Sequence, residues 1–189
     1  MIEIEKTYLA KEVPKDLKNS KHKEIIDVYI PKEEVHPNLR LRKQGEKYEL
    51  TKKQPIKEGD ASQQTEQTII LTQKEFNSIY SQIQGKKVRK IRYYYEYKNK
   101  IAEFDVFQDE LEGLIVVDFE FETKKEKDEF EMPTFCLADI TQETFIAGGM
   151  ICSKKYEDIE EKLNKFGYKK ILLKWKPSFN INFINKPKN

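Results

Sequence analysis

Hydrophobic and polar residues alternate with a period of two along most of residues 2–122. Successive side chains of a strand point to opposite faces, so this alternation predicts strands that each have one apolar face. Turn-forming residues such as Gln44-Gly45-Glu46 separate the runs, and Lys98-Asn99-Lys100 is expected to be a hairpin tip. We expect strands over 2–9, 24–31, 38–43, 47–54, 64–71, 87–97, 100–107 and 114–122.

Three segments carry the signals of helices instead. Thr72-Gln73-Lys74-Glu75 is a capping box and begins a helix that Gly85 is expected to stop. Thr123-Lys124-Lys125-Glu126 is a second capping box, before a short charged helix. A third helix is expected to end at Gly167, because apolar residues recur at helical spacing before it: Tyr156, Ile159, Leu163 and Phe166.

The chain is expected to form one α+β domain dominated by strands. Its 189 residues are 38% hydrophobic, which suits a single core of ordinary size. The apolar faces of the strands must be covered, and the predicted helices are the elements that can pack outside them. We place the domain at 1–175. Residues 176–189 have no sustained period and are rich in Lys, Pro and Asn, so they are interpreted as a basic tail.

The overall charge is close to balanced. Lys and Arg number 35 against 33 Asp and Glu, so the net charge of +2 gives no general attraction to nucleic acid or acidic membranes. The two cysteines have neither metal-type nor disulfide-type spacing, and no apolar run is long enough to span a bilayer. The acidic start, Met1-Ile2-Glu3-Ile4-Glu5, does not resemble a signal peptide, so a cytoplasmic protein is expected.

Charged residues occupy alternate positions of the predicted strands, opposite the apolar ones. Residues two apart share one face of a strand. Six same-face pairs result: Glu3 with Glu5, Arg40 with Arg42, Thr51 with Lys53, Lys90 with Arg92, Glu103 with Asp105, and Asp118 with Glu120.

The charged pairs are segregated by sign. The simplest explanation of alternating charge would be a solvent-exposed sheet face. Such a face, however, usually mixes acidic and basic residues. Like charges two residues apart repel unless an ion of opposite charge lies between them. Clustered carboxylates suit Mg²⁺ or Mn²⁺, and clustered Lys and Arg suit phosphate oxygens. A metal-bound polyphosphate would satisfy both groups.

Several short motifs resemble the CYTH family of triphosphate tunnel metalloenzymes, over roughly residues 1–165. The resemblance implies a closed antiparallel barrel of about eight strands around a tunnel that binds a linear triphosphate with a divalent metal. The motifs occur in the family's order: Glu3-Ile4-Glu5, Leu39-Arg40-Leu41-Arg42, Leu50-Thr51-Lys52-Lys53, Lys90-Ile91-Arg92-Tyr93, Glu103-Phe104-Asp105, Leu111-Glu112-Gly113-Leu114, Asp118-Phe119-Glu120 and Ala138-Asp139-Ile140-Thr141.

The resemblance and the charge pattern together assign roles to the charged residues. Phosphate oxygens are expected to bind Arg40, Arg42, Lys53, Lys90 and Arg92. The expected ligands of Mg²⁺ or Mn²⁺ are Glu3, Glu5, Asp118 and Glu120, and Glu103 and Asp105 are expected to support them or to orient water. The expected catalytic residues are Glu5, Lys6, Lys53 and Glu66.

Two positions depart from the family pattern. The family opens with Glu-x-Glu-x-Lys, whereas here Thr7 stands at the lysine position and Lys6 precedes it. A shift of one residue turns a side chain to the other face, so either Lys6 reaches the site through a bulge or Thr7 replaces it. The family usually has Arg-x-Glu-x-Glu where this chain has Gln64-Thr65-Glu66-Gln67-Thr68.

The preferred function is hydrolysis of inorganic tripolyphosphate, because no adenine or thiazolium pocket is recognisable. Class IV adenylate cyclase and thiamine triphosphatase are the alternatives among enzymes. A polyphosphate-binding or nucleotide-binding module without turnover is the non-enzymatic alternative, favoured by the displaced lysine. A nucleic-acid-binding barrel is the least favoured function. The sequence is compatible with a monomer and with a homodimer.

Overall fold

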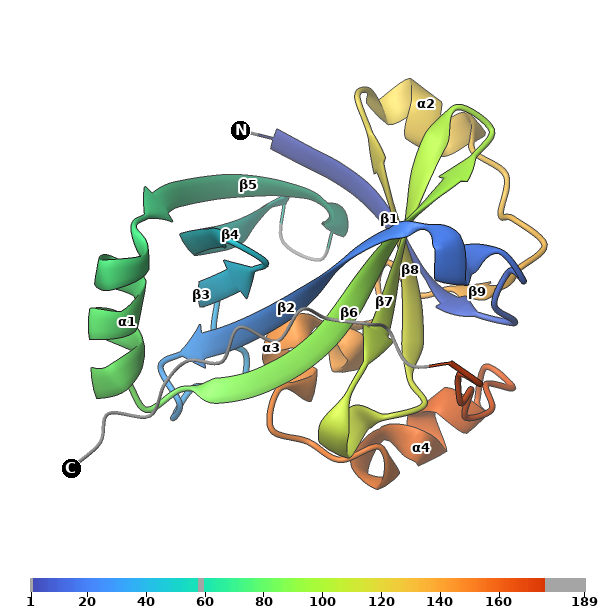
Figure 1. Ribbon diagram of the computed structural model, residues 1–189. Coiled ribbons are helices and arrows are strands. Elements are labelled where there is room, and N and C mark those ends of the chain that lie inside the picture. The colour runs from blue at the N-terminus through green and yellow to red at the C-terminus, as the bar shows by residue number, and fades with distance from the viewer. Residues whose placement is uncertain (1, 58–59, 176–189) are drawn as a thin grey trace.

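The computed structural model describes residues 2–57 and 60–175, and its strands form one closed antiparallel barrel (Figure 1). The eight barrel strands follow the order β5-β4-β3-β2-β6-β7-β8-β1, and a β1–β5 pairing closes the ring. Their bounds are β1 Ile2–Ala10, β2 Lys21–Ile30, β3 Leu39–Gln44, β4 Lys47–Lys57, β5 Asp60–Leu71, β6 Lys86–Tyr97, β7 Lys100–Phe107 and β8 Ile115–Phe121. All eight strands predicted from the alternation are confirmed, with ends within a few residues.

The first strand closes the barrel because its two edges have different partners. Residues 2–4 pair with 63–65 of β5, and residues 4–9 pair with 116–121 of β8. The short ninth strand β9, Cys136–Asp139, then continues along β1 on residues 8–10. Strands that are distant in the sequence therefore meet side by side, and an enclosed interior results.

The outward faces of the strands form the hydrophobic core together with the helices, as the alternation predicted. Helix α1, Gln73–Gln82, places Phe76 against Val28, Leu41 and Tyr48 on the outside of β2, β3 and β4. Elsewhere the outward faces of β1, β6, β7 and β8 share a second core that contains Phe104. Most apolar side chains thus lie outside the ring of strands. A third core includes Val88, Phe107 and Val116, which share a strand face with Lys90, Asp105 and Asp118, so the inside is apolar toward one end and polar over the rest.

The three predicted helices are all present, with one boundary corrected. Helix α1 has both hydrogen bonds of the Thr72–Glu75 capping box, and α2, Lys124–Glu129, begins where Thr123 accepts from the backbone of Glu126. Helix α1 ends with Ile83 in an extended conformation, so Gly85 is not its stop. A Cβ at Gly85 would lie 2.3 Å from a Val28 methyl carbon, so close packing explains this glycine.

The longest of the remaining helical elements, α4, Glu157–Asn164, lies below the barrel strands in the view of Figure 1. Helix α4 precedes Gly167, whose φ of +73° suits a glycine after a helix. The other helical elements are α3, Gly148–Ile151, and the 3-10 helices η1 Leu17–Asn19, η2 Asp109–Leu111 and η3 Thr144–Ile146.

The chain after α4 returns to the barrel wall. Ile171, Leu173 and Trp175 pack against the core outside β6, β7 and β8. The predicted basic tail, 176–189, lies outside the described residues. Within residues 2–57 and 60–175, no helix combines the length and the apolar character needed to cross a bilayer.

Candidate active site

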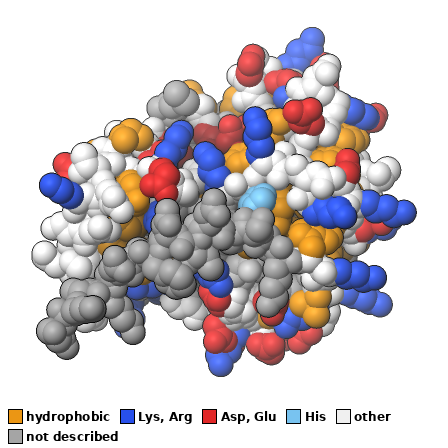
Figure 2. All heavy atoms as spheres, in the orientation of Figure 1, with side chains coloured by type: hydrophobic (Ala, Val, Ile, Leu, Met, Phe, Trp, Pro, Cys, Tyr) orange, Lys and Arg blue, Asp and Glu red, His pale blue; other side chains and the backbone are white. Residues whose placement is uncertain are grey.

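The inward faces of the strands surround one cavity of about 450 Å³. All six same-face pairs predicted from the sequence line it, together with Glu66. On the visible outer surface, in contrast, acidic and basic side chains are interspersed (Figure 2). The structure therefore places the segregated charges inside the barrel, rather than on a solvated outer face.

Carboxylates on β1 and β8 form one wall of the cavity, which we call the acidic wall: Glu3, Glu5, Asp118 and Glu120. Glu5 and Glu120 are direct cross-strand partners. Burial, together with the charges of Glu3 and Asp118, raises the pKa of Glu5 to about 7 against the opposing effect of Lys53. Carboxylates this crowded favour either a proton or a cation among them.

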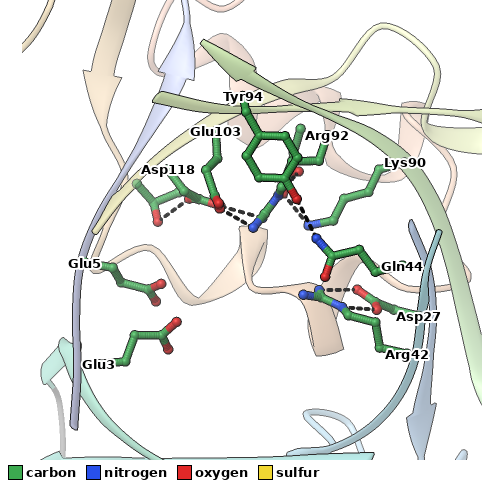
Figure 3. Close-up of polar contacts among 12 residues, drawn as sticks. Glu3, Glu5, Asp27, Arg42, Gln44, Lys90, Arg92, Tyr94, Glu103 and Asp118 are labelled. Atoms are coloured by element: carbon green, nitrogen blue, oxygen red, sulfur yellow. Dashed lines mark hydrogen bonds and ion pairs between the residues drawn. The ribbon is translucent and has the colours of Figure 1, made fainter. Parts of the chain in front are cut away.

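Cationic side chains on β3, β4 and β6 form the opposite wall, which we call the basic wall: Arg40, Arg42, Lys53, Lys90 and Arg92. Figure 3 shows Arg42 and Lys90 on the far side of the open interior from Glu3 and Glu5, whereas Arg92 reaches Asp118 directly. The side chain of Arg92 is only 11% exposed, so this charge is largely removed from water.

Asp105 on β7 holds two members of the basic wall. It lies opposite Arg92 in the β6–β7 register, accepts two hydrogen bonds from that guanidinium, at 2.7 and 2.6 Å, and also contacts the Lys90 ammonium. Arg92 reaches Glu103 and, at 3.2 Å, Asp118 as well. Burial alone would raise the pKa of Asp105, but Arg92 and Lys90 outweigh it and lower the pKa to about 2.

Asp27 on β2 holds Arg42 in the same way. Its two carboxylate oxygens accept from Nε and Nη2 of Arg42 at 2.6 and 2.7 Å. Asp27 is 1% exposed, and although burial would raise its pKa, the Arg42 charge keeps that pKa well below the usual value. Asp27 is not among the predicted site residues; its signal in the sequence is a lone acid among the apolar residues Ile25, Ile26 and Val28.

Lys53 connects the two walls. Its ammonium contacts Glu3 and lies 3.3 Å from Glu66 of β5, its direct cross-strand partner. Glu66 is therefore in the cavity, as the sequence suggested. Gln64, at the family's arginine position, also lines the cavity, and its Nε2 donates to Glu5 Oε1 at 3.1 Å.

Thr7 takes the place of the family lysine, and Lys6 does not reach the cavity. The β1–β8 pairing is continuous from residue 4 to residue 9, so no bulge turns Lys6 inward. Lys6 lies opposite the core residue Phe119, and its ammonium donates to the carbonyl of Phe130 at 3.4 Å. Thr7 lines the cavity and donates to Asp118 Oδ1 at 2.8 Å.

The segment after β9 covers one end of the cavity. The Thr141 hydroxyl accepts from the Thr7 backbone at 3.0 Å and donates to Asp139 at 2.6 Å. Gln142 reaches the β4–β5 hairpin, where its Oε1 accepts from the Ala61 backbone at 2.9 Å. Residues 139–142 therefore anchor the first strand and the hairpin around the site.

The acidic wall fits a divalent cation by its chemistry, although it is not arranged as a complete ligand set. Among the described residues, no group of three or more His, Cys, Asp or Glu side chains stands close enough to hold a metal ion. Hard carboxylate oxygens are nevertheless the ligands that Mg²⁺ and Mn²⁺ prefer, and a cation would relieve the repulsion around Glu5.

The raised pKa of Glu5 predicts how the ligand-free protein responds to pH. A carboxyl that binds its proton more tightly when folded stabilises the fold below its unfolded pKa, near 4.5, and this stabilisation is lost as pH rises through about 7. We expect a higher melting temperature at pH 5 than at pH 8 in EDTA. Glu5→Gln should reduce this difference; a difference unchanged in Glu5→Gln would contradict the assignment.

Comparisons with known proteins support the fold. No protein-family model matches the chain, and no curated protein matches it significantly. A crystal structure of "hypothetical protein NE1496" is 24% identical, with a TM-score of 0.58, covering 81% of this chain and 99% of that one. A structure of "inorganic triphosphatase NE1496" is 22% identical, with a TM-score of 0.57, covering 79% of this chain and 93% of that one. The chain therefore shares the fold of these structures, and the predicted closed antiparallel barrel is confirmed.

Proposed function

We propose that this protein is a divalent-metal-dependent hydrolase of a linear triphosphate and that inorganic tripolyphosphate is its preferred substrate. One observation carries the proposal: an acidic wall and a basic wall face each other across a single enclosed cavity. The related fold of the inorganic triphosphatase NE1496 is consistent with it.

The basic wall would neutralise and orient the substrate. A triphosphate carries several negative charges in a short span, and hydrolysis requires one phosphorus to lie in line with the attacking water. Arg40, Arg42, Lys53, Lys90 and Arg92 come from three strands and surround the cavity on one side, so they can contact successive phosphate groups. Arginine suits paired phosphate oxygens, and lysine acts as a point charge.

The acidic wall would hold the metal. Glu3, Glu5, Asp118 and Glu120 would be the ligands of Mg²⁺ or Mn²⁺, which supplies charge neutralisation at the phosphoryl group. Glu66, Glu103 and Asp105 would support the ligands or orient water. Burial raises the pKa of Glu103 to about 7, which suits this carboxylate to accept the proton of the attacking water near neutral pH.

A binding module with little turnover is the second candidate, and Thr7 is the observation that favours it. At the position where the family motif has a lysine, this chain has the neutral hydroxyl of Thr7, which already donates a hydrogen bond to Asp118. If the missing cation limits turnover, Thr7→Lys should raise kcat several-fold with the fold unchanged by circular dichroism. Thr141→Val, which removes only the neighbouring hydroxyl, is the control. No gain in kcat from Thr7→Lys would show that the threonine is not the limiting feature.

A side-by-side assay tests the proposed function. Tripolyphosphate, ATP and thiamine triphosphate are each incubated with Mg²⁺ or Mn²⁺ or with EDTA, and the products are identified. We expect phosphate release from tripolyphosphate that stops with EDTA. Cyclic AMP with pyrophosphate would instead identify a cyclase, preference for thiamine triphosphate would identify that phosphatase, and binding without product would favour the binding module.

A further inference from the structure

The basic wall contains two neighbouring arginines whose surroundings differ. Arg40 and Arg42 both point inward from β3, and both line the cavity. Arg42 Nε and Nη2 each donate one hydrogen bond to Asp27, which leaves the second Nη2 hydrogen and both Nη1 hydrogens as donors for anything in the cavity. Arg40 Nε lies 4.0 Å from the same carboxylate and, among the described residues, is a buried nitrogen without a hydrogen-bond partner.

The register of β2 and β3 explains this arrangement. Asp27 is the direct cross-strand partner of Arg42, and Tyr29 is the partner of Arg40. Cross-strand partners have their Cβ atoms about 5 Å apart, which lets a short aspartate reach both donors of one guanidinium. The bidentate geometry fixes the plane of the Arg42 guanidinium, which a single contact would leave free to rotate.

We propose that Asp27 is a positioning residue for anion binding: it fixes the Arg42 guanidinium at the cavity wall, so that the donors of Arg42 that Asp27 leaves free can contact phosphate. This inference rests on the proposed function, because it assumes that phosphate enters the cavity. Asp27 itself would not contact the substrate. It acts through Arg42, so its effect on binding should vanish when Arg42 is replaced.

A double-mutant cycle tests this dependence. The wild type, Asp27→Asn, Arg42→Gln and the double variant are titrated calorimetrically with tripolyphosphate in EDTA at low salt, so that turnover does not interfere. Asparagine at position 27 retains one carbonyl acceptor for Arg42, and in the double variant the two introduced amide side chains form a neutral pair. We expect Asp27→Asn to weaken binding by about 10-fold, as is usual for strongly coupled neighbours, and the double variant to bind as Arg42→Gln does.

A matched control is available outside the barrel. Asp109 holds Arg89 through two hydrogen bonds, at 2.8 and 2.5 Å, in the same bidentate geometry but away from the cavity. Asp109→Asn should leave tripolyphosphate affinity unchanged, and its φ of +56° is one that asparagine tolerates. This control separates the loss of a bidentate ion pair from a specific effect on the site.

Each outcome decides the inference. The inference is overturned if Asp27→Asn weakens binding equally in the wild type and in Arg42→Gln. It is also overturned if Asp27→Asn lowers the melting temperature but leaves the affinity for tripolyphosphate unchanged. If Asp27→Asn does not fold, the double variant is compared with Arg42→Gln alone; equal affinity supports the inference, and weaker binding by the double variant overturns it. If the wild type binds no tripolyphosphate, both the proposed function and this inference are overturned. If it binds tripolyphosphate without hydrolysing it, only the proposed hydrolase activity is overturned and the inference about Asp27 can still be tested.

Discussion

Replacing Arg40 and Arg42 together by glutamine should weaken tripolyphosphate binding by about 100-fold or more. Each arginine can offer charge-assisted hydrogen bonds to phosphate, and such bonds contribute about 1.5–3 kcal/mol each. Both side chains are largely removed from solvent, at 13% and 10% exposed, so water screens them little. Calorimetric titration of the double variant against the wild type measures the loss.

The control for this experiment is Arg89→Gln. Arg89 is an ion-paired arginine on the outside of β6, bound to Asp109 and Glu24, and its side chain is 37% exposed. Its replacement removes one positive charge without touching the cavity, so affinity should stay within about twofold of the wild type. If the double variant of Arg40 and Arg42 binds tripolyphosphate as tightly as the wild type, these arginines do not bind the phosphate groups.

Replacing Asp105 by alanine should be the most destabilising single change in the cavity. It would leave Lys90 and Arg92 as neighbouring buried cations without their shared carboxylate. Removal of one partner from a buried ion pair typically costs about 3–5 kcal/mol. Urea unfolding of the ligand-free variant should therefore show a clearly lower midpoint with a similar slope.

An exposed ion pair provides the comparison for Asp105. Glu110 and Lys155 lie 3.8 Å apart with side chains 68% and 65% exposed. Glu110→Ala should change stability by less than about 1 kcal/mol, because solvent already screens that pair. Tripolyphosphate should restore part of the lost stability of Asp105→Ala, since a ligand that binds only the folded state raises its stability. A midpoint for Asp105→Ala equal to that of Glu110→Ala would contradict the importance of this carboxylate.

The alternation of residue types was enough to predict each of the eight barrel strands and each same-face pair, although not the short strand β9. Side-chain direction within a strand is a local property, so Glu3 with Glu5, or Lys90 with Arg92, could be assigned to one face without knowing the fold. The helix starts at Thr72 and Thr123 were equally local, because a capping box involves only four neighbouring residues.

Two features of the site depended on partners distant in the sequence. Whether Lys6 or Thr7 faced the cavity was decided by the unbroken β1–β8 pairing. The role of Asp27 depended on its register with Arg42, fifteen positions away on the next strand. An isolated acid in an apolar strand indicates that some partner exists, but the sequence does not say which one.

The sequence by itself determined which side chains share a face, and with the family resemblance it indicated that these faces enclose a tunnel. Only the tertiary structure decided how the faces meet: β1 joins β5 and β8, so that carboxylates of β1 and β8 confront cations of β3, β4 and β6. The physical reason is that alternation follows from the backbone of each strand, whereas closure, register and ion pairing depend on contacts between strands far apart in the chain.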